Sequence, residues 1–384
     1  MKPVSQSVAS LQRSGVRAVM DIAFRTPGVL RLEVGDPDFP TPAHIVEAAA
    51  SAARSGYTHY TPSQGLPEVR QAMAEKLSSF NGLRVGRDDV VVSAGGGHAL
   101  FAVYRALCDP GDMVLAPDPG WPNYGTIASL TGAAIERYPL LREEGFSPDF
   151  DALAGLLDKH PNVKLIVVNT PGNPTGAVWG EEILSRLAEL CRIHDVYLIS
   201  DECYEAITFE KSHISPGTLD AERTVSVFSV SKTYAMTGWR VGYVTGPAEV
   251  VSMVGRVVEN TVSCAAAVSQ KAAEAALRGD QRPVAEMVAA YESRRDLAME
   301  RLGEQGLSAI EPEGAFYVMV EVPTADTVAF ASELVAADKV TVAPGEAFGP
   351  GGSGLIRLSL ASDESTIEEG IRRLGRFVRD RVLE

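Results

Sequence analysis

The sequence predicts an α/β fold with a large domain and a smaller α+β domain. Between about residues 90 and 245, short β-branched runs alternate with longer stretches of helical periodicity. This alternation is typical of a parallel sheet wrapped by helices. The chain of 384 residues is longer than one ordinary compact domain. Beyond about residue 280, a long helical stretch precedes short separated strands, and this change of pattern indicates the second domain.

The expected elements follow in chain order. An N-terminal segment, 1–46, holds an apolar run at 30–35 and a proline-rich turn, and we expect it to associate with the small domain. The large domain is expected over 47–280, and the small domain over 281–384 with strands at 315–320 and 355–360. The strand candidates of the large domain are 90–93, 113–116, 164–168, 196–200, 225–229 and 241–245. Polar residues that follow such strands are the first candidates for a site, because parallel sheets bind ligands at the carboxyl ends of their strands.

Composition excludes several classes of function. A net charge of -15 disfavours nucleic acid and anionic membranes as partners, because both repel an acidic protein. No apolar run has the length of a signal peptide or a membrane span, so we expect a cytoplasmic protein. Four scattered cysteines without CxxC spacing, and six histidines without ligand pairing, predict neither disulfides nor a metal site.

Lys232 is the first candidate for chemistry. It follows the strand at 225–229 directly, so it should reach the mouth of the sheet rather than solvent. A lysine by itself is more often a solvated surface charge. A lysine that forms an imine needs a lowered pKa, which burial and nearby positive charge such as Arg240 supply.

A glycine-rich turn at 94–97 follows the first strand of the large domain and opens a helix. Bare backbone amides at a helix start bind anions, and glycines let a phosphate approach closely. A tight strand-to-helix turn without a ligand explains the pattern equally well. A dinucleotide loop is disfavoured because GxGxxG is absent.

Four other side chains lie in turns or directly after strands. Asp201 follows the strand at 196–200, and Tyr204 comes three residues later. Asn173 lies in the turn NTPGNPTG, and Trp121 lies in PGWPNY. Each also has a purely structural explanation. Asp201 could cap the following turn, Tyr204 could be a buried structural tyrosine, and the segment around Asn173 could be a plain Pro-Gly turn. Trp121 could belong to the core.

Arg357 lies within an apolar strand, in the sequence LIRLS. An unpaired charge would be costly there, so the guanidinium needs an anionic partner. That partner is either a ligand carboxylate, which an arginine fork binds in bidentate fashion, or a buried carboxylate of the protein.

Together these segments resemble the class I and II aminotransferases of fold type I, the aspartate aminotransferase-like enzymes. The resemblance rests on SVSKTYAMTGWRVGY at 229–243, on NTPGNPTG and on the other motifs above, in family order from about 32 to 360. It implies a large domain with a mainly parallel seven-stranded sheet. It also implies pyridoxal 5'-phosphate as cofactor, held as an imine on Lys232.

The resemblance also implies a role for each matched residue. Asp201 would hold the proton on the ring nitrogen, while Tyr204 and Asn173 contact the ring oxygen. Trp121 would stack on the ring and, like Asn173, border the substrate. The phosphate ligands would be Gly96, Gly97, Ser229 and Arg240. Arg357, helped by the backbone of Gly35, would bind the substrate α-carboxylate. Tyr60 would reach the phosphate of a neighbouring subunit, so the resemblance implies a homodimer.

The expected activity is transfer of an amino group from an L-amino acid to a 2-oxo acid in two half-reactions, with Lys232, Asp201 and Tyr204 as catalytic residues. The closest rival is a lyase or synthase of the same superfamily that performs carbon–sulfur β-elimination. A non-catalytic binding module is disfavoured because Lys232 is retained.

Substrate choice is the least determined property of the sequence. Aspartate-type or general amino acids are ranked first, followed by aromatic and alanine-type ones. The region 260–264 supplies no cation for a distal carboxylate, so Arg13, Arg17 and Arg105 are the candidates.

Overall fold

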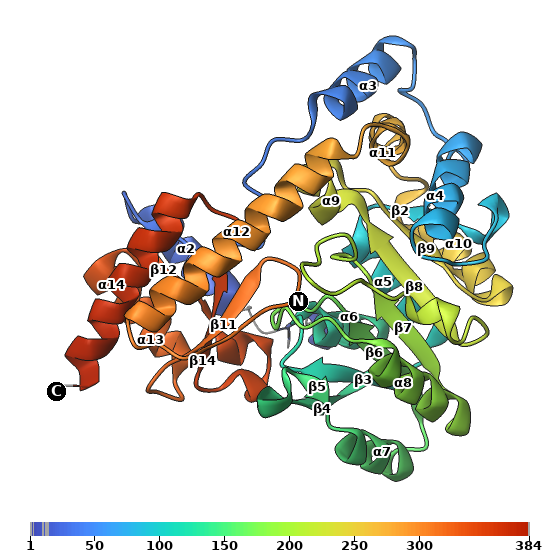
Figure 1. Ribbon diagram of the computed structural model, residues 1–384. Helices are drawn as coiled ribbons and strands as arrows, with labels where there is room; N and C mark the ends of the chain where they lie inside the picture. The colour runs from blue at the N-terminus through green and yellow to red at the C-terminus, as the bar shows by residue number, and fades with distance from the viewer. Residues whose placement is uncertain (1, 3, 10, 12–14, 383–384) are drawn as a thin grey trace.

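The computed structural model describes residues 2, 4–9, 11 and 15–382. Its largest element is an eight-stranded sheet in the order β2-β9-β8-β7-β6-β3-β4-β5 (Figure 1). The strands are β2 (Val91–Ser93), β3 (Met113–Asp118), β4 (Ala134–Leu141), β5 (Ser147–Pro148), β6 (Val163–Asn169), β7 (Tyr197–Asp201), β8 (Thr224–Ser229) and β9 (Gly242–Thr245). The adjacent strands β4, β3, β6, β7 and β8, in this order across the sheet, are parallel to one another. β9 runs antiparallel to both of its neighbours, β8 and β2. The expected α/β fold with a mainly parallel sheet is confirmed.

Two strands of this sheet were not among the sequence candidates. β4 is largely exposed or half-buried, and charged residues interrupt its apolar pattern. β5 contributes only two residues, paired antiparallel with β4, and it makes the sheet eight-stranded rather than seven-stranded. β5 is the edge strand and pairs with only the last two residues of β4, so most of β4 has a neighbouring strand on one side alone. A strand near the edge of a sheet needs no continuous apolar run, because only part of it is buried.

Helices cover both faces of the large sheet. They are α3 (Ala43–Arg54), α4 (Pro67–Ser79), α5 (Gly96–Leu107), α6 (Asn123–Thr131), α7 (Phe150–Lys159), α8 (Glu181–Ile193), α10 (Ala248–Val262) and α11 (Ala267–Arg278). Alternate residues of one strand belong to different cores. Val114 of β3 packs with α5, α6 and α10, whereas Leu115 packs with α7 and α8. Burial on both faces explains why the central strands are continuous apolar runs.

A smaller antiparallel sheet has the order β10-β11-β14-β13. Its strands are β10 (Ala309–Ile310), β11 (Tyr317–Glu321), β13 (Ala343–Pro344) and β14 (Leu355–Ser359). The helices of this region are α12 (Arg282–Glu304), α13 (Thr327–Asp338) and α14 (Glu364–Val382). α12 and α14 pack on one another and on this sheet, with Phe316, Ile356 and Leu374 in their shared core.

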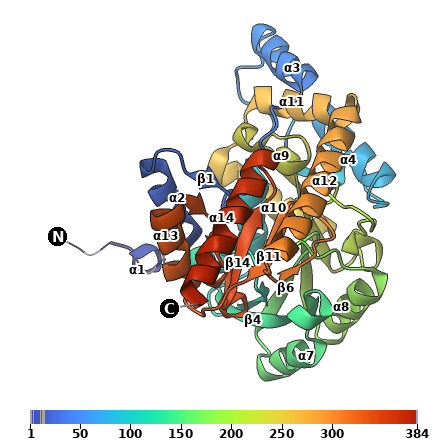
Figure 2. The ribbon, with the colours of Figure 1, turned by 60° about the vertical axis from the view of Figure 1, so that its left-hand side comes forward.

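The N-terminal segment lies beside this smaller sheet. β1 (Leu30–Arg31) pairs in parallel with β12 (Val340–Thr341), and α2 (Gly15–Arg25) contacts α13 (Figure 2). The division of the chain into domains at 46/47 and 280/281 stays a prediction. Within the part of the chain that the structure describes, no helix combines the length and apolarity needed to cross a lipid bilayer.

Candidate active site

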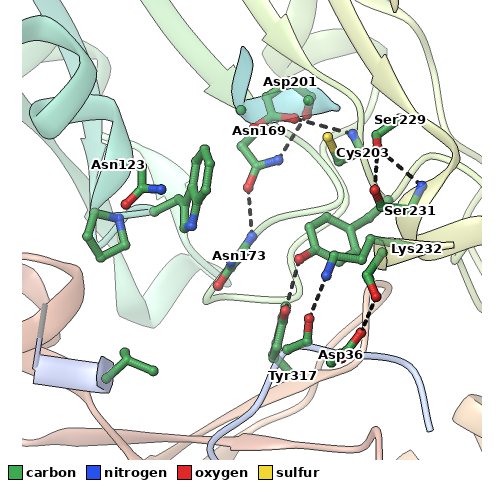
Figure 3. Close-up of a pocket in the computed structure, with 18 of the residues that line it drawn as sticks. Asp36, Asn123, Asn169, Asn173, Asp201, Cys203, Ser229, Ser231, Lys232 and Tyr317 are labelled. Atoms are coloured by element: carbon green, nitrogen blue, oxygen red, sulfur yellow. Dashed lines mark hydrogen bonds between the residues drawn. The ribbon is translucent and has the colours of Figure 1, made fainter. Parts of the chain in front are cut away.

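A cavity of about 520 Å³ lies at the carboxyl ends of β6, β7 and β8, between the large sheet and the smaller one. Asp201, Lys232 and Asn123 come to it from three sides (Figure 3). Eleven of the residues to which the resemblance gives a role line it: Gly35, Gly96, Gly97, Trp121, Asn173, Asp201, Tyr204, Ser229, Lys232, Arg240 and Arg357. Tyr60 does not line it and is 88% exposed on the surface of the chain. The structure thus brings together residues that are up to 322 positions apart in the sequence.

Asp201 ends β7 and is buried. Its Oδ2 accepts a hydrogen bond from the Tyr124 hydroxyl at 2.7 Å, and its Oδ1 accepts one from the Cys203 backbone amide at 3.3 Å. Burial raises the pKa of the Asp201 carboxyl, whereas hydrogen bonds from Cys203 and Tyr124 lower it. The site therefore holds a carboxyl group whose charge is stabilised by two donors from outside its own strand.

Lys232 lies on α9 (Val230–Thr233), the short helix that follows β8. Its Nζ donates a hydrogen bond to the Gly35 carbonyl at 2.5 Å. Burial, supported by the charges of Arg357 and Arg240, lowers the pKa of Lys232 to about 8 against the pull of Asp36 and Cys203. At pH 7 roughly a tenth of this side chain is therefore neutral, nucleophilic amine, far more than for an ordinary lysine.

The glycine turn and Arg240 fit closely together. Gly95 has a φ of +89°, and a Cβ there would lie 2.4 Å from Arg240 Nη2. A Cβ on Gly96 would lie 3.0 Å from Cys203 Sγ and 3.5 Å from Ser229 Cβ. Since α5 begins at Gly96, its free amides, the Ser229 hydroxyl and the Arg240 guanidinium border the same space. This combination is suited to an anion with several oxygens.

Arg357 of β14 is buried and has no carboxylate partner among the described residues. Its Nη1 donates to Asn173 Oδ1 at 2.8 Å, and its Nη2 donates to the Glu33 carbonyl at 2.7 Å. Its Nε is buried without a hydrogen-bond acceptor. Burial lowers the pKa of Arg357. A guanidinium held by neutral oxygens, with its Nε left without an acceptor, differs from the buried ion pair considered as an alternative, and it favours an external carboxylate.

Two tyrosines form the wall beside Arg357. The hydroxyls of Tyr204 and Tyr317 are 2.8 Å apart and hydrogen-bonded. The Arg357 guanidinium lies 4.1 Å from the centroid of the Tyr317 ring. A Cβ at Gly35 would lie 2.1 Å from the Tyr317 hydroxyl, so only glycine fits there. Gly35 is thereby required for packing as well as for the carbonyl that accepts from Lys232.

Sequence reasoning missed several lining residues, above all Tyr124, Asp36 and Tyr317. Tyr124 directly follows the PGWPN motif but lies within α6, where a tyrosine is expected to be a buried core residue. Its ring packs edge-on against Trp121, with centroids 5.4 Å apart. Asp36 lies in the proline-rich turn and accepts a hydrogen bond from Thr237 at 2.7 Å. Nothing local in the sequence shows which hydroxyl reaches which carboxylate.

The structure distinguishes between the arginines that the sequence offered for binding a distal substrate carboxylate. Arg17 of α2 lines the cavity. Arg105 does not, and its Nη1 donates to the Cys108 carbonyl at 3.4 Å. Arg13 lies outside the described residues. Arg17, Lys232, Arg240 and Arg357 together give the cavity four basic side chains against two carboxylates, Asp36 and Asp201. An anionic ligand fits this balance.

Comparison with known proteins agrees with this geometry. The family model described as aminotransferase class I and II matches residues 27–374. The chain is 39% identical to the aspartate/prephenate aminotransferase of Thermus thermophilus, with 98% of this chain and 99% of that protein covered. It is 39% identical to an arginine–pyruvate transaminase of Pseudomonas aeruginosa, with 90% and 89% covered. A solved structure of aspartate aminotransferase from Thermus thermophilus with maleate has a TM-score of 0.93 and 38% identity, covering 98% of this chain and all of that one.

Proposed function

The chain belongs to the class I and II aminotransferases, and from this premise we propose how its residues carry out pyridoxal-phosphate-dependent amino transfer. One observation carries the proposal: a lysine with a lowered pKa and a buried carboxylate, Lys232 and Asp201, line the same cavity. In this proposal Lys232 would bind the cofactor, and Asp201 would face its ring nitrogen.

The residues present fit pyridoxal phosphate. The cradle of Gly95, Gly96 and Arg240 would be filled by any added side chain at the glycines, and its donors suit a phosphate. Asp201, whose charge is supported by Tyr124, suits a protonated pyridine nitrogen. Trp121, Tyr204 and Asn173 line the cavity, where Trp121 would offer a face for stacking and the other two would offer polar groups to the ring oxygen. When bound, the cofactor supplies a ring that accepts the electrons left on the substrate α-carbon.

Lys232 is the group that moves the proton. A lysine with a pKa of about 8 can take the proton from the substrate α-carbon onto its Nζ, hold it as an ammonium group and give it back, because its two protonation states are close in free energy near neutral pH. Asp201 holds its charge throughout. Tyr204, hydrogen-bonded to Tyr317, stays a neutral donor because burial raises the pKa of Tyr204 well above its ordinary value.

Arg357 and Asn173 bind the substrate α-carboxylate in this proposal. The free Nε of Arg357 and the existing bond to Asn173 place donors on one side of the cavity. A carboxylate held at two points cannot rotate freely, so the bond to the α-hydrogen keeps one orientation. The donor would be an aspartate-type amino acid first, in line with the aspartate aminotransferases among the relatives, and the acceptor a 2-oxo acid.

Tyr60 supports a homodimer with shared sites. It is 88% exposed in the single chain, which is unusual for a large aromatic residue. We expect its hydroxyl to reach the phosphate of the partner subunit. Sedimentation should give a dimer, and Tyr60→Phe should weaken cofactor affinity in that dimer. A monomer with full activity would contradict this part of the proposal.

A cytoplasmic location also stays a prediction.

The central experiment replaces Lys232. Lys232→Ala should remove both the visible absorption band of the holoenzyme and amino transfer from aspartate to 2-oxoglutarate. Lys271→Ala, a change at a lysine of α11 that does not line the cavity, is the matched control and should keep both. An unchanged spectrum in Lys232→Ala would contradict the assignment.

Carbon–sulfur β-elimination is tested in the same assay. Incubation of the wild-type enzyme with a cysteine-type thioether in the absence of a 2-oxo acid should release little pyruvate or ammonia. Rapid release without an acceptor would favour the lyase over the aminotransferase reading.

A further inference from the structure

The loop between β13 and β14 of the smaller sheet forms part of the cavity wall. It contains two short helices, η5 (Gly345–Phe348) and η6 (Pro350–Gly352). Phe348 is buried and lines the cavity, and its ring centroid lies 4.8 Å from the Arg357 guanidinium. The position of this loop therefore determines what surrounds the arginine to which the substrate α-carboxylate is assigned.

Asp118, the last residue of β3 in the large sheet, contacts this loop through its side chain. Its Oδ1 accepts a hydrogen bond from the Gly351 backbone amide at 2.9 Å. A Cβ on Gly349, whose φ is +122°, would overlap the same carboxylate oxygen. A Cβ on Gly351 would lie 2.8 Å from the backbone carbonyl oxygen of Asp118. The two glycines thus leave room for the carboxylate but not for side chains of their own.

Backbone groups next to Asp118 join the loop to the same end of β3. The Gly120 amide donates to the Phe348 carbonyl at 2.8 Å. Arg137 of β4 donates from Nη1 to the Phe348 and Pro117 carbonyls, each at 3.4 Å. Since Gly120 directly precedes Trp121, the loop that carries Phe348 and the turn that carries Trp121 are held at one place on the large sheet.

Stability does not account for the half-buried carboxylate of Asp118. Burial raises its pKa, whereas the hydrogen bond from Gly351 and the charge of Arg137 lower it, and the net shift is upward. The ionised carboxylate therefore does not stabilise the folded protein. Its contact with the loop calls for a different explanation.

We propose that Asp118 is a positioning residue for substrate binding. Its hydrogen bond to Gly351 holds the loop between β13 and β14 on the large sheet, so that Phe348 stays packed against the Arg357 guanidinium. This inference rests on the proposed function, because the substrate α-carboxylate is taken to be at Arg357. Asp118 does not itself line the cavity and acts only through the loop. Because Lys232 and the proposed phosphate donors lie on other segments, the cofactor should bind without this contact.

The test compares Asp118→Ala with Asp118→Asn, which keeps one carbonyl oxygen for the Gly351 amide. Asp158→Ala controls for net charge, because Asp158 is exposed on α7 and does not line the cavity. Values of kcat and KM are measured for aspartate at a saturating 2-oxo acid, and cofactor affinity is measured by titration of the visible absorption. Backbone hydrogen exchange of residues 345–352 and thermal unfolding are measured on the same purified proteins.

In Asp118→Ala, KM for aspartate should rise by about tenfold while kcat changes much less, as expected when one hydrogen bond to a charged group supports binding rather than the chemical step. Hydrogen exchange of residues 345–352 should become faster, with cofactor affinity and unfolding temperature close to those of the wild type. Asp118→Asn should restore KM to within about threefold of the wild-type value. Asp158→Ala should change none of these quantities.

Two results would overturn the role of Asp118. One is an unchanged KM and unchanged hydrogen exchange in Asp118→Ala, and the other is a KM in Asp118→Asn as high as in Asp118→Ala. A wild-type protein that transfers no amino group would instead contradict the proposed function, while hydrogen exchange of the loop would still test its attachment through Asp118.

Discussion

Asp201 and Glu202 are neighbours in the chain and both are buried carboxylates, but their surroundings differ. Asp201 lines the cavity and accepts from Tyr124 and Cys203. Glu202 is fully buried away from the cavity, where its Oε2 accepts from His213 Nε2 at 2.8 Å and from the Ser215 hydroxyl. Successive residues at a strand end point to opposite sides, so one carboxylate meets the ligand space and the other meets the protein interior.

Because of this contrast, we expect changes at Asp201 to affect mainly activity and changes at Glu202 to affect mainly stability. Asp201 has a raised pKa because burial disfavours its charge, and the folded protein is therefore destabilised by the ionised form at neutral pH. Glu202 serves as the shared acceptor of two buried donors that have few other partners. Burial alone thus does not distinguish a functional carboxylate from a structural one, whereas the residues around each carboxylate do.

Among the residues around these two carboxylates, the largest effect is expected for Asp201→Asn. Amino transfer should fall by about 10²–10³-fold, the range for loss of one electrostatic contact in an active site. The cofactor-free protein should unfold at an equal or higher temperature, since the cost of burying the charge is removed. Steady-state kinetics and thermal unfolding check this. Lower stability with normal kcat would reverse the roles of the two carboxylates.

Glu202→Ala should act mainly on stability. His213 and Ser215 would lose their acceptor, and the free energy of unfolding should fall by about 3 kcal/mol, as expected for two unsatisfied buried donors. At a temperature where the variant is folded, kcat should change much less than in Asp201→Asn. Urea unfolding measures the loss, with Glu249→Ala, a change at an exposed position of α10, as control. Comparable stability in both variants would show that the buried cluster is unimportant.

Tyr124→Phe tests how the charge on Asp201 is supported. Loss of the 2.7 Å hydrogen bond should lower kcat by about tenfold, given roughly 1.5 kcal/mol for a bond to a charged group. The bond lowers the pKa of Asp201, so its removal raises that pKa and protonates the carboxylate at higher pH. The acid limb of the pH–rate profile should therefore move to higher pH. A shift to lower pH would contradict the proposed role.

The smallest effect is expected for Ser215→Ala. The variant loses one of the two side-chain donors to Glu202, and Asn81 Nδ2 loses its 2.8 Å acceptor but keeps its bond to Glu205. We expect a loss of about 1 kcal/mol in unfolding free energy and unchanged kinetics. Urea unfolding and kcat measured side by side decide this. A kinetic defect larger than that of Tyr124→Phe would mean that the structural cluster is coupled to the site.

Parts of the fold and the site were predictable because they depend on local sequence. The central strands are apolar runs because both faces are buried, and β4 was missed because its faces are partly exposed. Lys232 and Asp201 could be found because Asp201 ends a buried strand and Lys232 lies in the short helix that follows another, and such residues reach the same edge of a parallel sheet. Tyr124 could not be distinguished from a core residue of α6, because its function lies in a bond to a residue 77 positions away.

The sequence by itself determined the α/β class, the order of the motifs and the types of side chain that follow the central strands. Only the tertiary structure decided that Arg357 donates to the Glu33 backbone carbonyl and to Asn173 but to no carboxylate in the described part of the chain. It alone also decided that Gly35 has no room for a side chain beside Tyr317, and that Arg17 rather than Arg105 lines the cavity. The physical reason is the range of the interactions. Strand and turn propensities act over a few residues, whereas these contacts join segments brought together by the packing of two sheets and the N-terminal segment.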